Sequence, residues 1–123
     1  MPESTIRIVI ADDHAVVLKG LETLLTLESD MAVVATCDSG ERTLEAVRQH
    51  HPDILLLDLL MPGMNGWEFC LHFRRQPALE RVPIIVHSST TNDPPPGANA
   101  IVRKPVKLDR LLSVVEEHCS PRV

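Results

Sequence analysis

Short apolar runs alternate with helix-type repeats along the chain. The apolar runs cover residues 6–11, 31–37, 53–59, 82–88 and 100–103, and their near-continuous hydrophobicity is typical of strands buried on both faces of a sheet. Apolar residues recur with helical spacing over residues 14–28, 39–50, from about 66 onward, and 107–119. This alternation predicts an α/β domain built around a parallel sheet.

Five strands joined by short right-handed crossovers predict a flavodoxin-like, doubly wound parallel sheet in the order 2-1-3-4-5. The run from Asp53 to Leu59 is the most apolar of the five and is expected to be the central strand. Strand order reverses between the first and third strands, which are neighbours. Because ligands bind at such a point, beyond the carboxyl ends of the strands, we expect a functional site there.

One crossover departs from this pattern. Only fifteen residues separate Ser88 from Lys104, and they include Pro94-Pro95-Pro96. Proline has no N–H group and biases the preceding residue away from the helical conformation. We therefore predict an extended strap in place of the fourth helix of the fold, which is missing or reduced to a turn.

Smaller signals refine the elements. Ser39 is a predicted N-cap of the second helix. In the third helix, the spacing of Trp67, Cys70 and Leu71 predicts that these side chains face the core. The three cysteines are widely spaced and form no CxxC pair, so neither a zinc site nor a disulfide framework is expected. Cys37 and Cys70 are interpreted as small core residues.

Composition narrows the class of protein. The chain has 123 residues, which fits one domain over residues 1–123. Its formal net charge of −5 argues against direct nucleic-acid binding. No apolar run approaches the roughly 18 residues that span a bilayer, and no signal-type leader opens the chain. We expect a cytoplasmic protein without membrane association.

Charged and hydroxyl residues stand at the ends of the predicted strands. Asp12 and Asp13 follow the first strand, and Asp58 lies at the end of the third. Two carboxylates 4 Å apart repel by about 4 kcal/mol at an effective dielectric constant of ~20. Such a cluster persists because a hard cation fills it or because the pKa of one carboxyl group rises sharply. An all-oxygen site suits Mg²⁺, with Mn²⁺ or Ca²⁺ as substitutes.

The remaining strand ends supply groups suited to a phosphoryl oxygen. Lys104 follows the fifth strand as a compact cation, and Ser88 ends the fourth as a hydrogen-bond donor. Asp58, at the centre, is then the natural nucleophile, because aspartyl phosphates are established carboxylate chemistry. Plainer interpretations remain: the Asp12-Asp13 pair as a helix cap, Lys104 as a surface lysine, and the neighbouring Ser89 in place of Ser88.

Four tracts resemble the receiver domain of two-component response regulators. IRIVIADDHAVVLKGL is similar to the opening of the NarL/FixJ-like subfamily. LLLDLLMPGMNG resembles the acceptor loop, with Pro62 four and Gly66 eight residues beyond Asp58. VPIIVHSS and AIVRKP resemble the last two strands. Together, in this order, the tracts cover most of the chain.

The resemblance implies a role for each site residue. Asp58 would accept the phosphoryl group. Asp13 would ligate Mg²⁺ directly, Asp12 through water, and Leu60 through its backbone carbonyl. Lys104 would pair with the phosphate and Ser88 would turn toward it. The Lys104-Pro105 bond would be cis, and the donor would be a histidine kinase or a phosphotransfer protein.

Two features that transmit the phosphorylation signal in the family, the fourth helix and an aromatic residue in the fifth strand, are altered here. The position that is aromatic in the fifth strand of the family is Ile101 here. We expect a phosphoacceptor module with at most slow self-dephosphorylation, not an enzyme, and a homodimer is compatible with this interpretation. A phosphorylation-independent pseudo-receiver is the alternative. A metal-dependent phosphatase fits less well, because Leu60 stands where its second acid is needed. The subfamily usually continues into a DNA-binding domain; we expect residues 1–123 to contain none, and a stand-alone and a truncated regulator both fit this expectation.

Overall fold

The computed structural model describes residues 5–61, 63–77, 79–90 and 93–118. The strands are β1 (Ile6–Ala11), β2 (Met31–Cys37), β3 (Ile54–Asp58), β4 (Ile84–Ser88) and β5 (Ala100–Arg103). The helices are α1 (Ala15–Thr26), α2 (Gly40–His50), α3 (Gly66–Arg74) and α4 (Leu108–His118). These elements confirm the predicted alternation, with boundaries within two residues for most of them.

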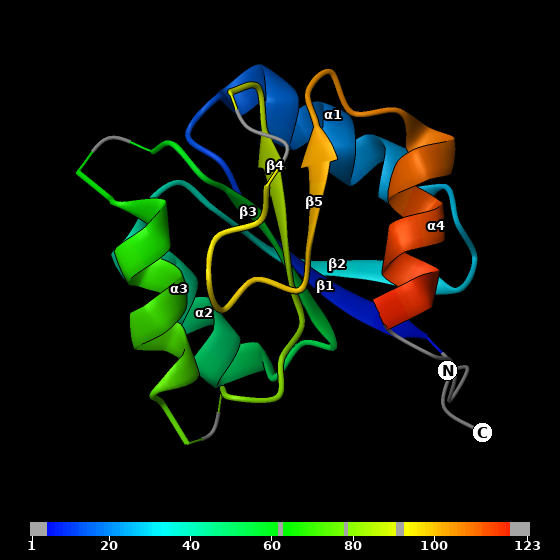
Figure 1. Cartoon of the computed structure of the whole chain (residues 1–123). Coiled ribbons are helices and arrows are strands. Elements are labelled where there is room, and N and C mark those ends of the chain that lie inside the picture. Colours follow the sequence, from blue (N-terminus) through cyan, green and yellow to red (C-terminus); the bar gives the residue numbers. More distant parts are fainter. Residues whose placement is uncertain (1–4, 62, 78, 91–92, 119–123) are drawn as a thin grey trace.

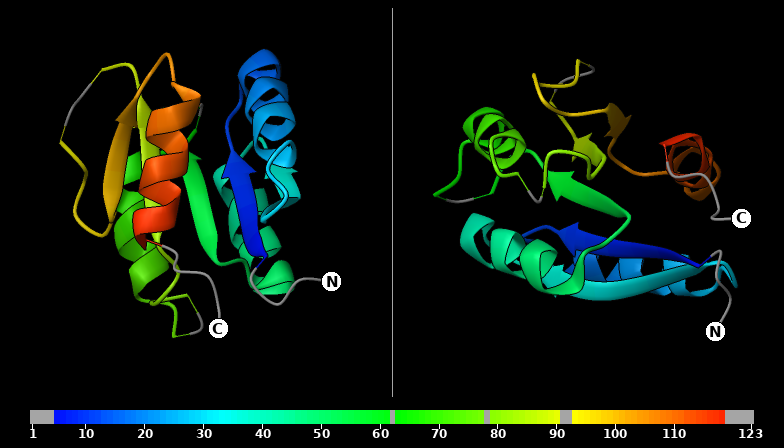
Figure 2. Two further views of the ribbon diagram at one scale, coloured as in Figure 1. Left: turned by 90° about the vertical axis from the view of Figure 1, so that its right-hand side faces the viewer. Right: turned by 90° about the horizontal axis from the view of Figure 1, so that it is seen from below.

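The five strands form one parallel sheet in the order β2-β1-β3-β4-β5 (Figure 1). This confirms the predicted flavodoxin-like fold. Helices α2 and α3 cover one face, and α1 and α4 cover the other (Figure 2). The central strand β3 is buried along its whole length, as a strand covered on both faces requires.

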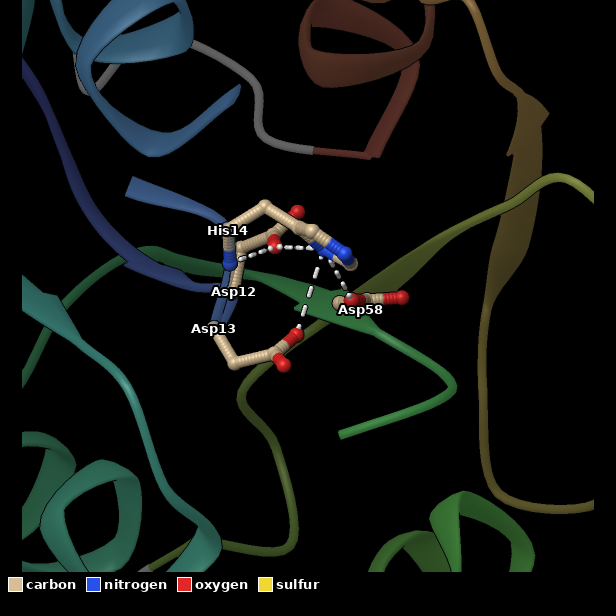
Figure 3. A group of neighbouring side chains, drawn as sticks. All are labelled: Asp12, Asp13, His14 and Asp58. Carbon is tan, nitrogen blue, oxygen red and sulfur yellow. Dashed lines mark hydrogen bonds and ion pairs between the residues drawn. The ribbon is translucent and has the colours of Figure 1, made fainter. Parts of the chain in front are cut away.

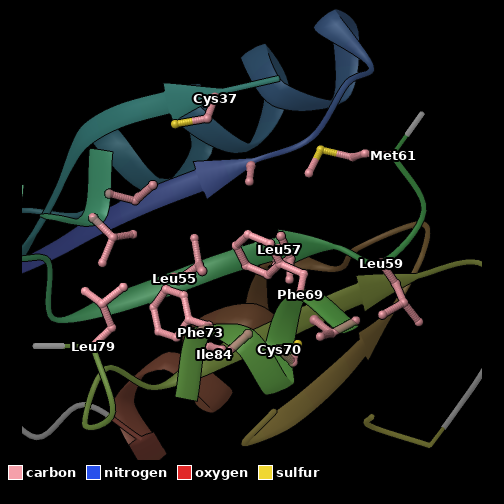
Figure 4. Close-up of a cluster of buried hydrophobic side chains, with 14 residues drawn as sticks. Cys37, Leu55, Leu57, Leu59, Met61, Phe69, Cys70, Phe73, Leu79 and Ile84 are labelled. Atoms are coloured by element: carbon pink, nitrogen blue, oxygen red, sulfur yellow. The ribbon is translucent and has the colours of Figure 1, made fainter. Parts of the chain in front are cut away.

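The core on the α2–α3 side is built around two aromatic rings (Figure 4). Phe69 and Phe73, one helical turn apart, have ring centroids 5.9 Å apart, and both are buried with Cys70. The prediction for Trp67 and Leu71 was wrong, because they are 41% and 43% exposed. At about 100° per residue, Trp67 lies on the far side of the helix from Phe69, and the phenylalanine pair determines which face packs inward.

Local capping explains where α2 and α3 begin. Ser39 Oγ accepts a hydrogen bond from the backbone N–H of Arg42 at 3.2 Å, which confirms the predicted cap. Asn65 Oδ1 accepts hydrogen bonds from the backbone N–H groups of Trp67 and Glu68, in the first turn of α3. Gly66 is required at the start of α3, since a Cβ there would lie 2.5 Å from the carbonyl oxygen of Leu59.

The crossover from β4 to β5, residues 89–99, contains no helix in its described part, residues 89–90 and 93–99. We call residues 89–99 the strap. Pro95 is buried, and its carbonyl oxygen accepts from the Ala98 N–H at 3.0 Å. Gly97 has a φ of 94° and lies against the backbone of Cys70 in α3. The predicted loss of the fourth helix is therefore confirmed for the described residues.

Arg74, at the end of α3, fastens the strap. Its Nε donates to the Gly97 carbonyl oxygen at 2.7 Å, and Nη2 donates to Asn99 Oδ1 at 2.5 Å. Nη1 donates to the carbonyl oxygens of Glu80 and Val82 at 3.0 and 2.7 Å. One guanidinium thus ties the strap to the loop that leads into β4. None of the helices in the described ranges is long and apolar enough to cross a membrane.

Candidate functional site

The sheet register brings the predicted site residues to one edge. Ala11 of β1 pairs with Leu57 of β3, so Asp12 and Asp58 end neighbouring strands. Asp58 in turn pairs with His87, and Ser88 pairs with Arg103 just before Lys104. Because the strands are parallel, all of these side chains lie at the carboxyl end of the sheet.

Three carboxylates and one imidazole share a small volume (Figure 3). Asp12, Asp13, His14 and Asp58 each offer one ligand atom, and these atoms all lie within 4.8 Å of one another. His14 Nδ1 lies 3.2, 3.3 and 3.9 Å from oxygens of Asp12, Asp13 and Asp58. The ring is 63% exposed, so the imidazole covers the solvent side of the acidic cluster.

Lys104 lies between two of the acids. Its Nζ is 3.3 Å from Asp12 Oδ2 and 3.5 Å from Asp58 Oδ1. The peptide bond that follows, Lys104-Pro105, is cis, as the family resemblance implied. The ammonium group is therefore shared between the two buried carboxylates.

Asp12 is completely buried and its carboxylate is held at both oxygens. Oδ1 accepts the backbone N–H of His14 at 2.8 Å, and Oδ2 lies 2.9 Å from Nε2 of His87. Burial alone would raise the pKa of this carboxyl group, but the bonds from His87 and His14 and the charge of Lys104 outweigh burial. The pKa of Asp12 is therefore well below its usual range, and the group stays ionised.

Asp58 has the opposite balance. It is 3% exposed, and Oδ1 accepts the Leu60 N–H at 3.2 Å. Burial raises the pKa of Asp58, and the negative charge of Asp12 adds to the increase. Among the described residues, two buried carboxylate oxygens have no hydrogen-bond partner: Asp58 Oδ2 and Asp13 Oδ1. A divalent cation would satisfy both, so the donor set fits an oxygen-liganded metal.

Ser88 lies at the end of β4 and is buried. Its Oγ accepts the Thr90 N–H at 3.1 Å and lies 3.2 Å from the Thr90 hydroxyl oxygen. The next residue, Ser89, is exposed. Pro62, predicted to follow the acceptor, lies outside the described residues.

Sequence reasoning missed the contact between His87 and Asp12. His87 is the penultimate residue of the buried strand β4 and is itself buried, so its imidazole is expected to be packed and hydrogen-bonded. Its partner, however, is an acid of the site itself. The available signal was one polar residue inside the apolar run VPIIVHS, because a buried imidazole requires a partner.

The fold and this strand-end cluster define a class of protein. The chain matches the family described as "Response regulator receiver domain" over residues 8–116. It therefore belongs to the family of response regulator receiver domains.

Individual relatives agree with this assignment. The chain is 32% identical over 118 residues to the transcriptional regulatory protein DegU of Brevibacillus brevis, covering 93% of this chain and 50% of that protein. It is 51% identical over 61 residues to the oxygen regulatory protein NreC of Staphylococcus epidermidis, covering 49% of this chain and 28% of NreC. The chain thus spans half or less of the length of these curated relatives.

A solved structure shows the same architecture. The signal receiver domain of the putative response regulator NarL from Mycobacterium tuberculosis superposes with a TM-score of 0.80 at 28% identity. The match covers 93% of this chain and 95% of that one. The likeness to DegU, NreC and NarL confirms the resemblance to the NarL/FixJ-like subfamily.

Proposed function

We propose that Asp58 accepts a phosphoryl group from a phosphohistidine of a histidine kinase or phosphotransfer protein, in a reaction that requires Mg²⁺. The observation that carries this proposal is Asp58 Oδ2: a buried carboxylate oxygen without a hydrogen-bond partner, beside a lysine and two further acids. Such an oxygen is available both as a nucleophile and as a metal ligand.

The residues present divide the work of holding the cation. Asp13 and Asp58 would bind Mg²⁺ through the oxygens that have no hydrogen-bond partner, and Leu60 through its backbone carbonyl. Asp12 would act through water, because both of its oxygens already accept hydrogen bonds. When bound, Mg²⁺ neutralises charge on the transferring group.

The transfer itself requires little from the protein beyond position and charge. An oxygen of Asp58 forms the bond to phosphorus as the P–N bond of the donor breaks, and the electron pair of that bond goes to the donor's imidazole nitrogen. Lys104 is 3.5 Å from Asp58 Oδ1 and would pair with a phosphoryl oxygen. Ser88 would donate its hydroxyl to another after leaving Thr90. Hydrolysis would be slow, since Leu60 offers no base two residues after Asp58.

A protein donor must contact the surface beside Lys104. An apolar groove adjoins this lysine and is lined by Val17 and Leu24 of α1 and by Ser89 and Pro105. On the same helix Val16 is 86% exposed. We propose that the donor docks along α1. Val16→Asp should then slow transfer from a phosphohistidine protein and leave labelling by a small phosphodonor unchanged.

The central test is labelling by acetyl phosphate with and without Mg²⁺. We expect Mg²⁺-dependent phosphorylation of the wild-type protein and none of Asp58→Asn, measured by intact mass. Asp38→Asn is a matched control, because that side chain is 61% exposed. Absence of labelling in a folded wild-type protein, or labelling of Asp58→Asn, would contradict the proposal. Size-exclusion chromatography of the same samples tests whether phosphorylation brings two copies together.

A phosphorylation-independent interaction module is not favoured, because each acid and the lysine of the site lie in the pocket. Some similar proteins are enzymes as a whole. One is the protein-glutamate methylesterase/protein-glutamine glutaminase 2 of Nitratidesulfovibrio vulgaris, of which the chain covers 25% at 37% identity. The receiver part alone corresponds to this chain, and we propose signalling rather than such an activity.

A further inference from the structure

His87 is an unusual member of a buried strand. Its side chain is 4% exposed, and the residues before it in β4 are Ile84, Ile85 and Val86. An imidazole in this position is destabilising unless a polar group satisfies it. The register places His87 directly beside Asp58, yet its Nε2 reaches past that neighbour to Asp12, at 2.9 Å.

The direction of this hydrogen bond follows from its partners. An ionised Asp12 carboxylate can only accept a hydrogen bond. Nε2 of His87 therefore carries a hydrogen and donates a hydrogen bond to Oδ2. The other oxygen, Oδ1, accepts from the His14 backbone at 2.8 Å. With a donor at each oxygen, the carboxylate cannot rotate about its Cβ–Cγ bond without breaking one of them.

His87 also shares its acceptor with Lys104. The Lys104 ammonium lies 3.3 Å from the same Oδ2 and 3.5 Å from Asp58 Oδ1. The shorter contact, from His87, offsets much of the cost of burying the Asp12 carboxylate. With the His87 hydrogen bond in place, Asp12 keeps a donor at Oδ2 when the ammonium group of Lys104 turns toward Asp58.

We propose that His87 is a positioning residue that fixes Asp12 for the hydration shell of the cation and leaves Lys104 free to pair with the phosphoryl group. This inference rests on the proposed function. The side chain of His87 contacts Asp12, which would hold the cation through water. It acts through Asp12, so its removal should weaken Mg²⁺ binding without abolishing it.

Two replacements of His87 that differ only in side-chain length provide a matched pair of variants. In His87→Gln the amide nitrogen is as many bonds from Cβ as Nε2 of histidine, so it can still donate to Asp12. In His87→Asn the amide nitrogen corresponds to Nδ1 and falls short. We expect the Mg²⁺ dissociation constant to rise about tenfold in His87→Asn and His87→Leu, and to stay within about threefold of wild type in His87→Gln.

The dissociation constants are measured from backbone amide chemical shifts during Mg²⁺ titration, which a chain of 13.7 kDa allows. A double-mutant cycle with Asp12→Asn adds a readout that a general packing role would not affect. If His87 acts through Asp12, then His87→Leu weakens Mg²⁺ binding in the wild-type background but not in the Asp12→Asn background. Should His87→Leu fail to fold, the Gln and Asn pair decides.

The outcomes separate this inference from the proposed function. Equal Mg²⁺ affinity for the Gln and Asn variants, or tighter binding by His87→Leu, overturns the role of His87. If the wild-type protein is still labelled on Asp58 in that case, the proposed function stands. A folded wild-type protein that binds no Mg²⁺ overturns both.

Discussion

The acidic pocket of Asp12, Asp13, Asp58 and Lys104 lies at the carboxyl ends of the strands, whereas the Arg74 end of the strap lies at the amino ends of β4 and β5, where Asn99 accepts the N–H of Ile84. The polar groups of the two regions are balanced in opposite ways. In the pocket, Asp58 and Asp13 each keep a buried oxygen without a hydrogen-bond partner. In the strap, the guanidinium of Arg74 makes four hydrogen bonds to groups already in place, among them the Gly97 carbonyl and the Asn99 side chain. The pocket thus offers two oxygens that a cation could bind, whereas the Arg74 end of the strap is joined to its neighbours by hydrogen bonds within the protein.

The site groups and the crossover that replaces the fourth helix are held by different parts of the molecule. The groups that would bind a cation and a phosphoryl group come from strand ends, which the sheet holds in position. The crossover that replaces the fourth helix is fastened to α3 instead, through Arg74 and through the close contact of Gly97 with Cys70. We therefore expect changes in the pocket to leave the Arg74 end of the strap in place. Four substitutions test whether the pocket and the strap are independent of each other.

The largest effect is expected in the pocket. Lys104→Met removes the cation shared by Asp12 and Asp58 and should slow labelling by acetyl phosphate about 100-fold. Mg²⁺ should bind more tightly to this variant, because a competing positive charge is gone. Labelling rate and Mg²⁺ affinity are measured side by side, with the exposed Lys107→Met as control. Parallel loss of both properties would mean that Lys104 has a structural role.

The hydrogen bonds of Arg74 to the strap are expected to affect the stability of the fold and not the rate of phosphoryl labelling. Arg74→Met removes four hydrogen bonds and should lower the free energy of unfolding by about 3 kcal/mol in urea denaturation. Arg74→Lys, which lacks the planar fork, should fall between this variant and wild type. The labelling rate of the folded fraction should not change. A rate that falls with stability would show that strap and pocket are coupled.

A smaller loss is expected where the strap meets α3. Gly97 has a φ of 94°, and an added Cβ would lie 3.1 Å from the Cys70 carbonyl oxygen. Gly97→Ala should therefore cost about 2 kcal/mol of unfolding free energy. Gly20→Ala is the matched control, because a Cβ there meets nothing within 4 Å and should stabilise α1 slightly. Equal effects of the two substitutions would contradict the close packing of the strap.

The smallest effect concerns charge repulsion. Because the pKa of Asp58 is raised in the folded state, its contribution to stability is present at low pH and is lost as the pH rises through that pKa. Asp58→Asn without Mg²⁺ should therefore be about 1 kcal/mol more stable than wild type at pH 7. Asp12, with its lowered pKa, acts in the other direction and loses its contribution as the pH falls.

The measurement is thermal unfolding across the pH range without metal. The advantage of Asp58→Asn should shrink toward acidic pH, where Asp58 of the wild-type protein becomes protonated. Adding Mg²⁺ at pH 7 should stabilise the wild-type protein more than the variant. An advantage that is independent of pH would point to packing rather than charge.

Much of this architecture was predictable because its signals are local. The strands over residues 31–37 and 100–103 and the Ser39 cap were predicted as they occur. The proline run excluded a helix through the backbone chemistry of each proline. The predicted convergence of Asp12, Asp58 and Lys104 follows from parallel strands, whose carboxyl ends share one edge.

The failures have a common physical cause. Trp67 and Leu71 have helical spacing that fits a core face, but the packing of Phe69 against Phe73 and the sheet decides which face turns inward. The hydrogen bonds of Arg74 to the strap were not predicted, because nothing in the sequence near this arginine indicates which four oxygens accept its N–H groups.

The sequence alone determined the order of the elements, the loss of the fourth helix and the acids at the strand ends, since these depend on residue type and spacing within short segments. The tertiary structure decided which oxygens stay without a partner, that Arg74 fastens the strap across 23 residues of sequence, and that His87 bonds to Asp12 across 75. Such pairs form between side chains of different packed elements, and a short sequence segment does not indicate how far apart those side chains will lie.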